Sequence, residues 1–223
     1  MISEEEIAAL KARIAELEHR TGVLEDIHAI RTLHFKYGYY MDKWLMKEIV
    51  DLFAEDCVLY FLNGIFKGKE GARRMYGADM GVTGPTRGVL TDHLHLQDIV
   101  DVAPDRRTAK GRFRCFLMGG VHESRKDPTP IPSQFWEGGV YENTYVKEDG
   151  VWKIKVFNYN LVWQAEYEKG WAHSGGKLLM ASPFIRTYPE DPHGPDELKP
   201  WPFQFWPETF VIPSHYPHPV TGE

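Results

Sequence analysis

Tyr37, Asp42 and His93 are the three side chains whose types and spacing best suit acid–base chemistry. Tyr37 precedes Asp42 by five residues, which places both near the C-terminal end of one predicted helix. His93 lies in the first long strand of the sheet that follows, where its imidazole can converge on the other two groups. Because a phenol, a carboxylate and an imidazole suffice to transfer protons, we expect a site that needs no cofactor.

Two of these residues also have a structural interpretation. In a flat strand His93 shares a face with His95, so either ring could simply belong to a two-sided sheet. Asp42 could cap a helix that begins near Lys43. The His-x-His pair resembles part of a metal site, but the spacing places no third ligand, so no metal is expected.

The N-terminal half of the chain is predicted to be mainly helical. Ser3 and Glu6 form a capping box that opens a helix. Its narrow apolar stripe consists of Ile7, Leu10, Ile14, Leu17 and Leu24. This stripe could dock on its own domain or form a subunit contact. A second helix is expected over residues 25–40 and short helices over 44–53 and 69–76.

The sheet is predicted from five strand-like runs. One covers residues 57–62 and ends at an Asn63-Gly64 hairpin signal. Four long strands follow, over residues 89–102, 108–122, 134–147 and 151–164, and short links make them an antiparallel meander. Helices followed by a bent sheet indicate an α+β domain with a cone-shaped pocket.

The chain is divided here into three parts: an N-terminal helical extension (1–22), a catalytic domain (23–166) and a C-terminal extension (167–223). The C-terminal extension is rich in proline, which excludes regular structure. It is nevertheless too apolar for a free linker, with Trp201, Phe203, Phe205, Trp206, Phe210 and Tyr216. We expect it to lie on its own domain or on a neighbouring subunit.

Composition limits the classes of partner. The net charge is -6, without the basic patch that nucleic acid requires. Cys57 and Cys115 lie in strand-like runs and are expected to be buried thiols in a reducing compartment. The acidic N-terminus has no signal peptide, and no apolar run reaches the length of a membrane span. A cytoplasmic protein is therefore expected, and the 13% of aromatic residues suits either a core or a flat aromatic ligand.

Residues 24–164 resemble the nuclear transport factor two-like superfamily, and within it the SnoaL-like group that contains scytalone dehydratase and bile acid 7α-dehydratase. The resemblance is carried by the Tyr37-x4-Asp42 step, the run Leu52-Phe-Ala-Glu-Asp-Cys-Val-Leu-Tyr60, the stretch Thr91-Asp-His93 and the hairpin Asp149-Gly-Val-Trp-Lys-Ile154. It implies a strongly curved antiparallel sheet packed on N-terminal helices, a cystatin-like α+β barrel. By analogy with the two dehydratases it also implies a homo-oligomer, a trimer rather than a dimer.

The resemblance assigns roles to individual residues. His93 would be the general acid or base, Asp42 would orient it or a water, and Tyr37 would hold or protonate a leaving oxygen. Tyr60 takes the place of a tyrosine that scytalone dehydratase uses with water. Strand alternation, apart from the resemblance, places Tyr141 and Asn143 on one face that lines the pocket or the core, with Glu137 on that face as a reserve acid. The substrate-binding positions expected are Tyr60, His95, Tyr141 and Asn143.

The chain also departs from these relatives. The second acid of the bile acid enzyme falls near Phe116, its C-terminal arginine near Leu161, and the asparagine of scytalone dehydratase near Tyr141. The general chemistry therefore transfers better than the substrate does.

The function expected is that of a cofactor-independent lyase. Its substrate would be phenolic or otherwise aromatic, including two-ring compounds derived from lignin, and it would act by dehydration or by retro-aldol loss of formaldehyde. One alternative is an isomerase or an epoxide hydrolase of the same fold. Another is a non-catalytic small subunit of a ring-hydroxylating dioxygenase.

Overall fold

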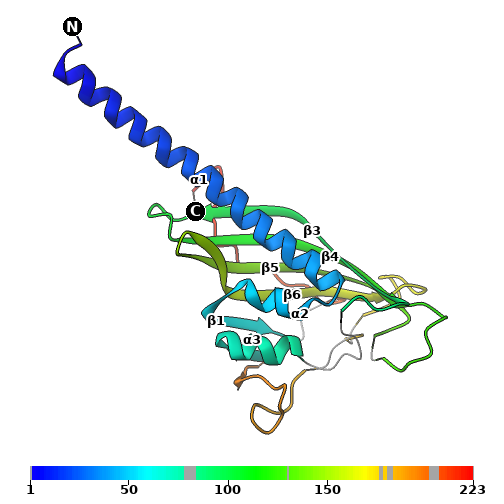
Figure 1. Cartoon of the computed structure of the whole chain (residues 1–223). Helices are drawn as coiled ribbons and strands as arrows, with labels where there is room; N and C mark the ends of the chain where they lie inside the picture. Colours follow the sequence, from blue (N-terminus) through cyan, green and yellow to red (C-terminus); the bar gives the residue numbers. More distant parts are fainter. Residues whose placement is uncertain are drawn as a thin grey trace.

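The computed structural model describes residues 2–77, 84–129, 131–175, 178–179, 183–200 and 206–222 (Figure 1). Its elements, in chain order, are α1 (Glu4–Asp42), α2 (Met46–Asp51), β1 (Phe53–Phe61), β2 (Gly64–Lys67), α3 (Gly68–Gly77), β3 (Val89–Val102), β4 (Thr108–Val121), β5 (Gln134–Glu148), β6 (Val151–Glu166) and β7 (Glu197–Leu198). Helices packed on a curved, open sheet confirm the predicted α+β class.

The sheet has the strand order β3-β4-β5-β6-β1-β2-β7. Strands β3 to β6 form the predicted antiparallel meander, and β1 joins it by parallel pairing with β6. Register shifts occur in β3 between His95 and Asp98, and in the β5–β6 pair near Gly139 and Tyr145. Bulges of this kind bend and twist a sheet, so they help to give it a concave inner face.

Helix α1 is one continuous helix, so the predicted break near residue 25 is wrong. The capping box of Ser3 and Glu6 is confirmed at its start. Gly22, in the middle of the helix, leaves room for a side chain from the turn between β3 and β4: a Cβ there would lie 1.9 Å from the guanidinium of Arg106. Arg106 crosses this gap to bind Asp26, so the glycine serves packing rather than helix termination.

The N-terminal half of α1 extends beyond the sheet (Figure 1). The predicted apolar stripe lies on this half, and its side chains are 43–67% exposed. The stripe therefore does not dock on its own domain. The buried face of the helix lies further along and holds Asp26, Ile30, His34 and Tyr37.

The described parts of the C-terminal extension pack on their own domain. Phe184 and Asn63 exchange two hydrogen bonds of 2.7 and 2.8 Å, and Asp196 binds Arg74. Further along, the backbone carbonyl of Ile212 accepts a hydrogen bond from Arg112 on β4. Trp201, Phe203 and Phe205 lie outside the described residues.

The thiols of Cys57 and Cys115 are buried and unpaired, as predicted. Burial raises the pKa of the Cys57 thiol to about 11. Among the described residues, no helix combines the length and the apolar character needed to cross a membrane.

Candidate active site

A cavity of about 340 Å³ lies between α1, α3 and the concave face of the sheet. Most of its wall is apolar, and the C-terminal extension contributes Leu178 and Phe184. The polar or titratable side chains of its wall are Tyr37, Tyr76, His93, Glu137, Tyr141, Tyr159, Gln164 and His193. An apolar pocket with a few converging polar groups is the usual form of a small-molecule site.

His93 lines this cavity and forms two hydrogen bonds with Asp42, which is not itself among the lining residues. The Oδ1 atom of Asp42 accepts the backbone N–H of His93 at 2.7 Å and lies 2.9 Å from its ring Nδ1. Both side chains are largely buried, with 8% and 13% of their surface exposed. Because a carboxylate only accepts hydrogen bonds, Nδ1 carries the proton and Nε2 is the basic nitrogen. Asp42 does not cap α2, which has Leu45 at its N-cap position and no side-chain cap.

A close contact between α1 and β3 makes this pair possible. A Cβ at Gly38 would lie 3.1 Å from the carbonyl oxygen of His93, so glycine allows the helix to approach the strand. After the helix, Trp44 adopts a positive φ of 53°. Its indole donates a hydrogen bond to the hydroxyl of Thr91, which in turn donates to the carbonyl of Asp42. These contacts fix the end of α1 against the strand that carries His93.

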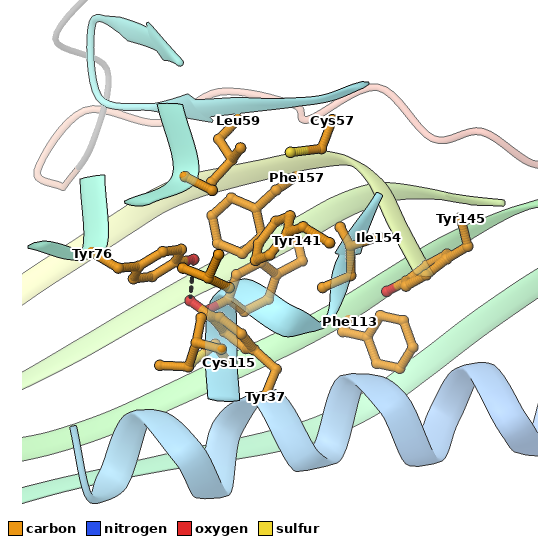
Figure 2. Close-up of a cluster of buried hydrophobic side chains, with 14 of the residues drawn as sticks. Tyr37, Cys57, Leu59, Tyr76, Phe113, Cys115, Tyr141, Tyr145, Ile154 and Phe157 are labelled. Carbon is orange, nitrogen blue, oxygen red and sulfur yellow. Dashed lines mark hydrogen bonds between the residues drawn. The ribbon is translucent and has the colours of Figure 1, made fainter. Parts of the chain in front are cut away.

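Tyr37 contributes a phenol to the cavity from the buried face of α1. The hydroxyl of Tyr76 on α3 donates to the hydroxyl of Tyr37 at 3.2 Å (Figure 2). Burial raises the pKa of both phenols. Tyr37 therefore stays protonated near neutral pH and can donate a hydrogen bond to a ligand oxygen.

Of the four predicted substrate-binding residues, Tyr141 lines the cavity, whereas Tyr60, His95 and Asn143 do not appear in its wall. Lys199 lies over the Tyr60 ring at 4.9 Å. Asn143 accepts a hydrogen bond from the backbone N–H of Asn158 at 2.9 Å.

His95 lies deeper, between the sheet and α1. Its ring packs on those of His34 and Tyr141, with centroids 4.4 and 5.3 Å away. Burial, assisted by the neighbouring His93, lowers the pKa of His95 to about 3. His95 is therefore a neutral core residue in this structure.

Glu137, Tyr159 and Gln164 form a hydrogen-bonded group in the wall of the cavity, and of these three the sequence pointed only to Glu137. Tyr159 and Gln164 on β6 both donate hydrogen bonds to the carboxylate of Glu137 on β5. The alternation of β5 pointed to Glu137 as a reserve acid. The sequence did not predict that Tyr159 and Gln164 face the cavity together, because simple alternation places their side chains on opposite faces of β6. A register shift in the β5–β6 pair brings both side chains to the same face.

No group of three or more His, Cys, Asp or Glu side chains suited to a metal ion occurs in the described ranges. That the protein needs no metal for its activity stays a prediction.

Comparison with solved structures places the fold among known proteins. A putative scytalone dehydratase from Novosphingobium aromaticivorans aligns with a TM-score of 0.51 and 22% identity, covering 74% of this chain and 96% of that one. A type 2 hexachlorocyclohexane dehydrochlorinase, LinA, aligns with a TM-score of 0.51 and 20% identity over 73% and 97% of the two chains. A putative aromatic ring hydroxylase from N. aromaticivorans aligns with a TM-score of 0.50 and 20% identity over 64% and 94%.

No curated protein matches the chain. The SnoaL-like domain family matches residues 22–158, which include α1 from Gly22 onward, the meander as far as the first half of β6, and all three residues of the predicted triad. The match covers more than half of the chain and agrees with the nuclear transport factor two-like fold of the structures above. This chain therefore belongs to the SnoaL-like domain family.

Proposed function

We propose that this protein is a cofactor-independent lyase that acts on an aromatic substrate, with His93 as its base. The observation that carries the proposal is the His93–Asp42 pair at the wall of an apolar cavity. A histidine whose Nδ1 is held by a carboxylate presents Nε2 as a base and gains stabilisation once it is protonated.

Dehydration is the simpler of the two reactions considered. His93 Nε2 takes a proton from a carbon next to the carbon that bears a hydroxyl group. The electron pair of the C–H bond forms the double bond, and the C–O bond breaks. Tyr37 donates a hydrogen bond to the departing oxygen, which leaves as water with the proton that His93 collected.

Retro-aldol loss of formaldehyde uses the same groups on a 1,3-diol. His93 Nε2 takes the O–H proton of the hydroxymethyl group, its C–O bond becomes the C=O bond of formaldehyde, and the C–C bond to that group breaks. The electron pair of the broken C–C bond forms a C=C bond, and the C–O bond of the second hydroxyl breaks. That oxygen leaves as water with the proton that His93 collected, while Tyr37 donates a hydrogen bond to it. Both reactions therefore require one base and one hydrogen-bond donor within reach of the reacting atoms.

The wall of the cavity supports an aromatic substrate. Its aromatic side chains are Tyr37, Trp44, Phe61, Tyr76, Tyr141, Phe157, Tyr159 and Phe184. A volume of about 340 Å³ falls in the range of sites for small organic molecules. Two similar structures are named as a putative scytalone dehydratase and a hexachlorocyclohexane dehydrochlorinase, and both names describe eliminations.

The test is turnover of hydroxylated aromatic compounds, including two-ring diols, read by mass spectrometry for loss of water, or of formaldehyde together with water. His93→Ala should lower turnover by roughly 10²–10⁴-fold, the range for loss of a general acid–base group. His122→Ala is the matched control, because His122 is exposed and its ring forms hydrogen bonds with Ser124 in its own turn. A folded His93→Ala protein with full activity would show that the chemistry lies elsewhere.

An isomerase is the second candidate, because a base and a phenol donor also suffice to move a proton between two carbons. The same screen distinguishes it, since an isomerase changes the chromatographic retention of the compound and leaves its mass unchanged.

A further inference from the structure

Glu137 lies in a row of four inward-facing side chains that crosses the sheet. His93 on β3 pairs with Leu117 on β4, Leu117 pairs with Glu137 on β5, and Glu137 pairs with Gln164 on β6. All four residues line the cavity. Adjacent strands are about 4.8 Å apart, so Glu137 is about 10 Å from His93 along this row. The cavity thus has a second titratable group, well separated from the predicted base.

The carboxylate of Glu137 is held by neutral donors. Tyr159 donates its hydroxyl to Oε1 at 2.6 Å, and Gln164 donates from Nε2 to Oε2 at 2.5 Å. The other end of the Gln164 amide accepts the backbone N–H of Leu179 at 2.7 Å, which fixes its orientation. Burial and the adjacent Glu137 raise the pKa of Tyr159, so its phenol keeps the proton that it donates.

This carboxylate keeps unused acceptor capacity. Glu137 is 6% exposed, and each of its oxygens accepts one of these bonds although a carboxylate oxygen can accept two. None of the lining residues that the structure describes is Lys or Arg. A buried carboxylate without a cation is costly in free energy, so its position beside the cavity indicates a ligand that donates to it.

The chemistry of the wall narrows the class of ligand. A ligand carboxylate or phosphate would meet the like charge of Glu137 and no Lys or Arg among the described lining residues. The largely apolar surroundings favour a neutral donor over a strongly hydrated ammonium group. A phenolic or alcoholic hydroxyl meets both conditions.

We propose that Glu137, oriented by Tyr159 and Gln164, binds a hydroxyl group at the end of the substrate remote from the bond that breaks. The preferred substrate is then a neutral, elongated aromatic molecule with a hydroxyl about 10 Å from the carbon near His93. This inference rests on the proposed function insofar as it takes the cavity as the substrate site. It adds a specificity determinant that plays no part in the proton transfer itself.

The test measures binding by calorimetry with rigid two-ring probes that differ in one group. The probes are 4-phenylphenol, 4-methoxybiphenyl, biphenyl-4-carboxylate and biphenyl-4-methanamine. For the unaltered protein we expect the phenol to bind roughly tenfold or more tightly than its methyl ether, as for a hydrogen bond to a charged acceptor. The carboxylate should bind most weakly, and the amine should bind less tightly than the phenol.

Glu137→Gln removes the charge with little change of shape. It should reduce the preference for the phenol over the ether to about threefold or less and should strengthen binding of the carboxylate. Glu142→Gln is the matched control, since Glu142 lies on the same strand but binds Arg112 and His215 and does not line the cavity. It should bind all four probes as the unaltered protein does.

Equal affinity of the unaltered protein for the phenol and the ether would overturn the proposal, and this comparison needs no variant. Tighter binding of the amine than of the phenol would overturn the neutral hydroxyl class. The result is separable from the proposed function, because His93→Ala should lose turnover and keep the preference for the phenol. If the lyase assignment fails instead, the binding preference persists while no compound is turned over.

Discussion

Asp26 joins α1, the helix that carries Tyr37 and Asp42, to the β3–β4 turn and to the ends of β5 and β6 that form their hairpin. Its carboxylate, 4% exposed, accepts hydrogen bonds from Arg106 at 2.7 Å, from Lys147 at 2.5 Å and from the indole of Trp152 at 3.0 Å. Burial would raise the pKa of Asp26, but these three donors outweigh it and lower the pKa from 3.8 to about 2. A shift of this size corresponds to roughly 2 kcal/mol of stability at neutral pH.

Asp26→Asn removes the charge and leaves the two cations without their partner. We expect the free energy of unfolding at pH 7 to fall by about 2–3 kcal/mol, measured by urea titration. Because the folded pKa is the lower one, the stabilisation is complete above the unfolded value near 4 and disappears as the pH falls through 2. The difference between the two proteins should therefore shrink between pH 5 and pH 2.

The matched control is Asp98→Asn. Asp98 binds Arg31, whose side chain is 44% exposed, so this pair should contribute less than about 1 kcal/mol. If Asp26→Asn lowers the free energy of unfolding by less than about 0.5 kcal/mol, or by the same amount at pH 7 and pH 3, this account of Asp26 is refuted.

Two further predictions concern the site and the assembly. Asp42→Asn should lower kcat by about 10–100-fold with little change in KM, because the lost charge stabilises only the protonated His93; Asp92→Asn, on the opposite face of β3, should stay within about twofold. The exposed stripe of α1 should mediate a homo-oligomer, with a trimer preferred, because exposed apolar patches of this kind usually mark contacts. Light scattering should show that assembly, and Leu10→Glu with Leu17→Glu should reduce it to monomer without changing thermal stability of the domain; a stable monomer of the unaltered chain at micromolar concentration would contradict this.

The sequence alone determined the elements whose signal is local. The four long strands and their turns follow from apolar alternation, and the start of α1 follows from the Ser3–Glu6 capping box, because both depend on residues a few positions apart. The sequence also predicted that Tyr37 and Asp42 lie near the end of one helix and that His93 lies in a strand, because helix and strand periods fix where such side chains point. The hydrogen bonds between Asp42 and His93 agree with those positions.

Tertiary structure decided the features that depend on long-range register. The sequence predicted a break between two helices near residue 25, whereas α1 is continuous and Arg106 crosses it at Gly22 to reach Asp26. Tyr159 and Gln164 reach Glu137 only because β6 shifts its register against β5. The packing of the C-terminal extension on its own domain is likewise fixed by contacts between residues 100 or more positions apart. No local period encodes such contacts, because they arise from the shape of the assembled sheet.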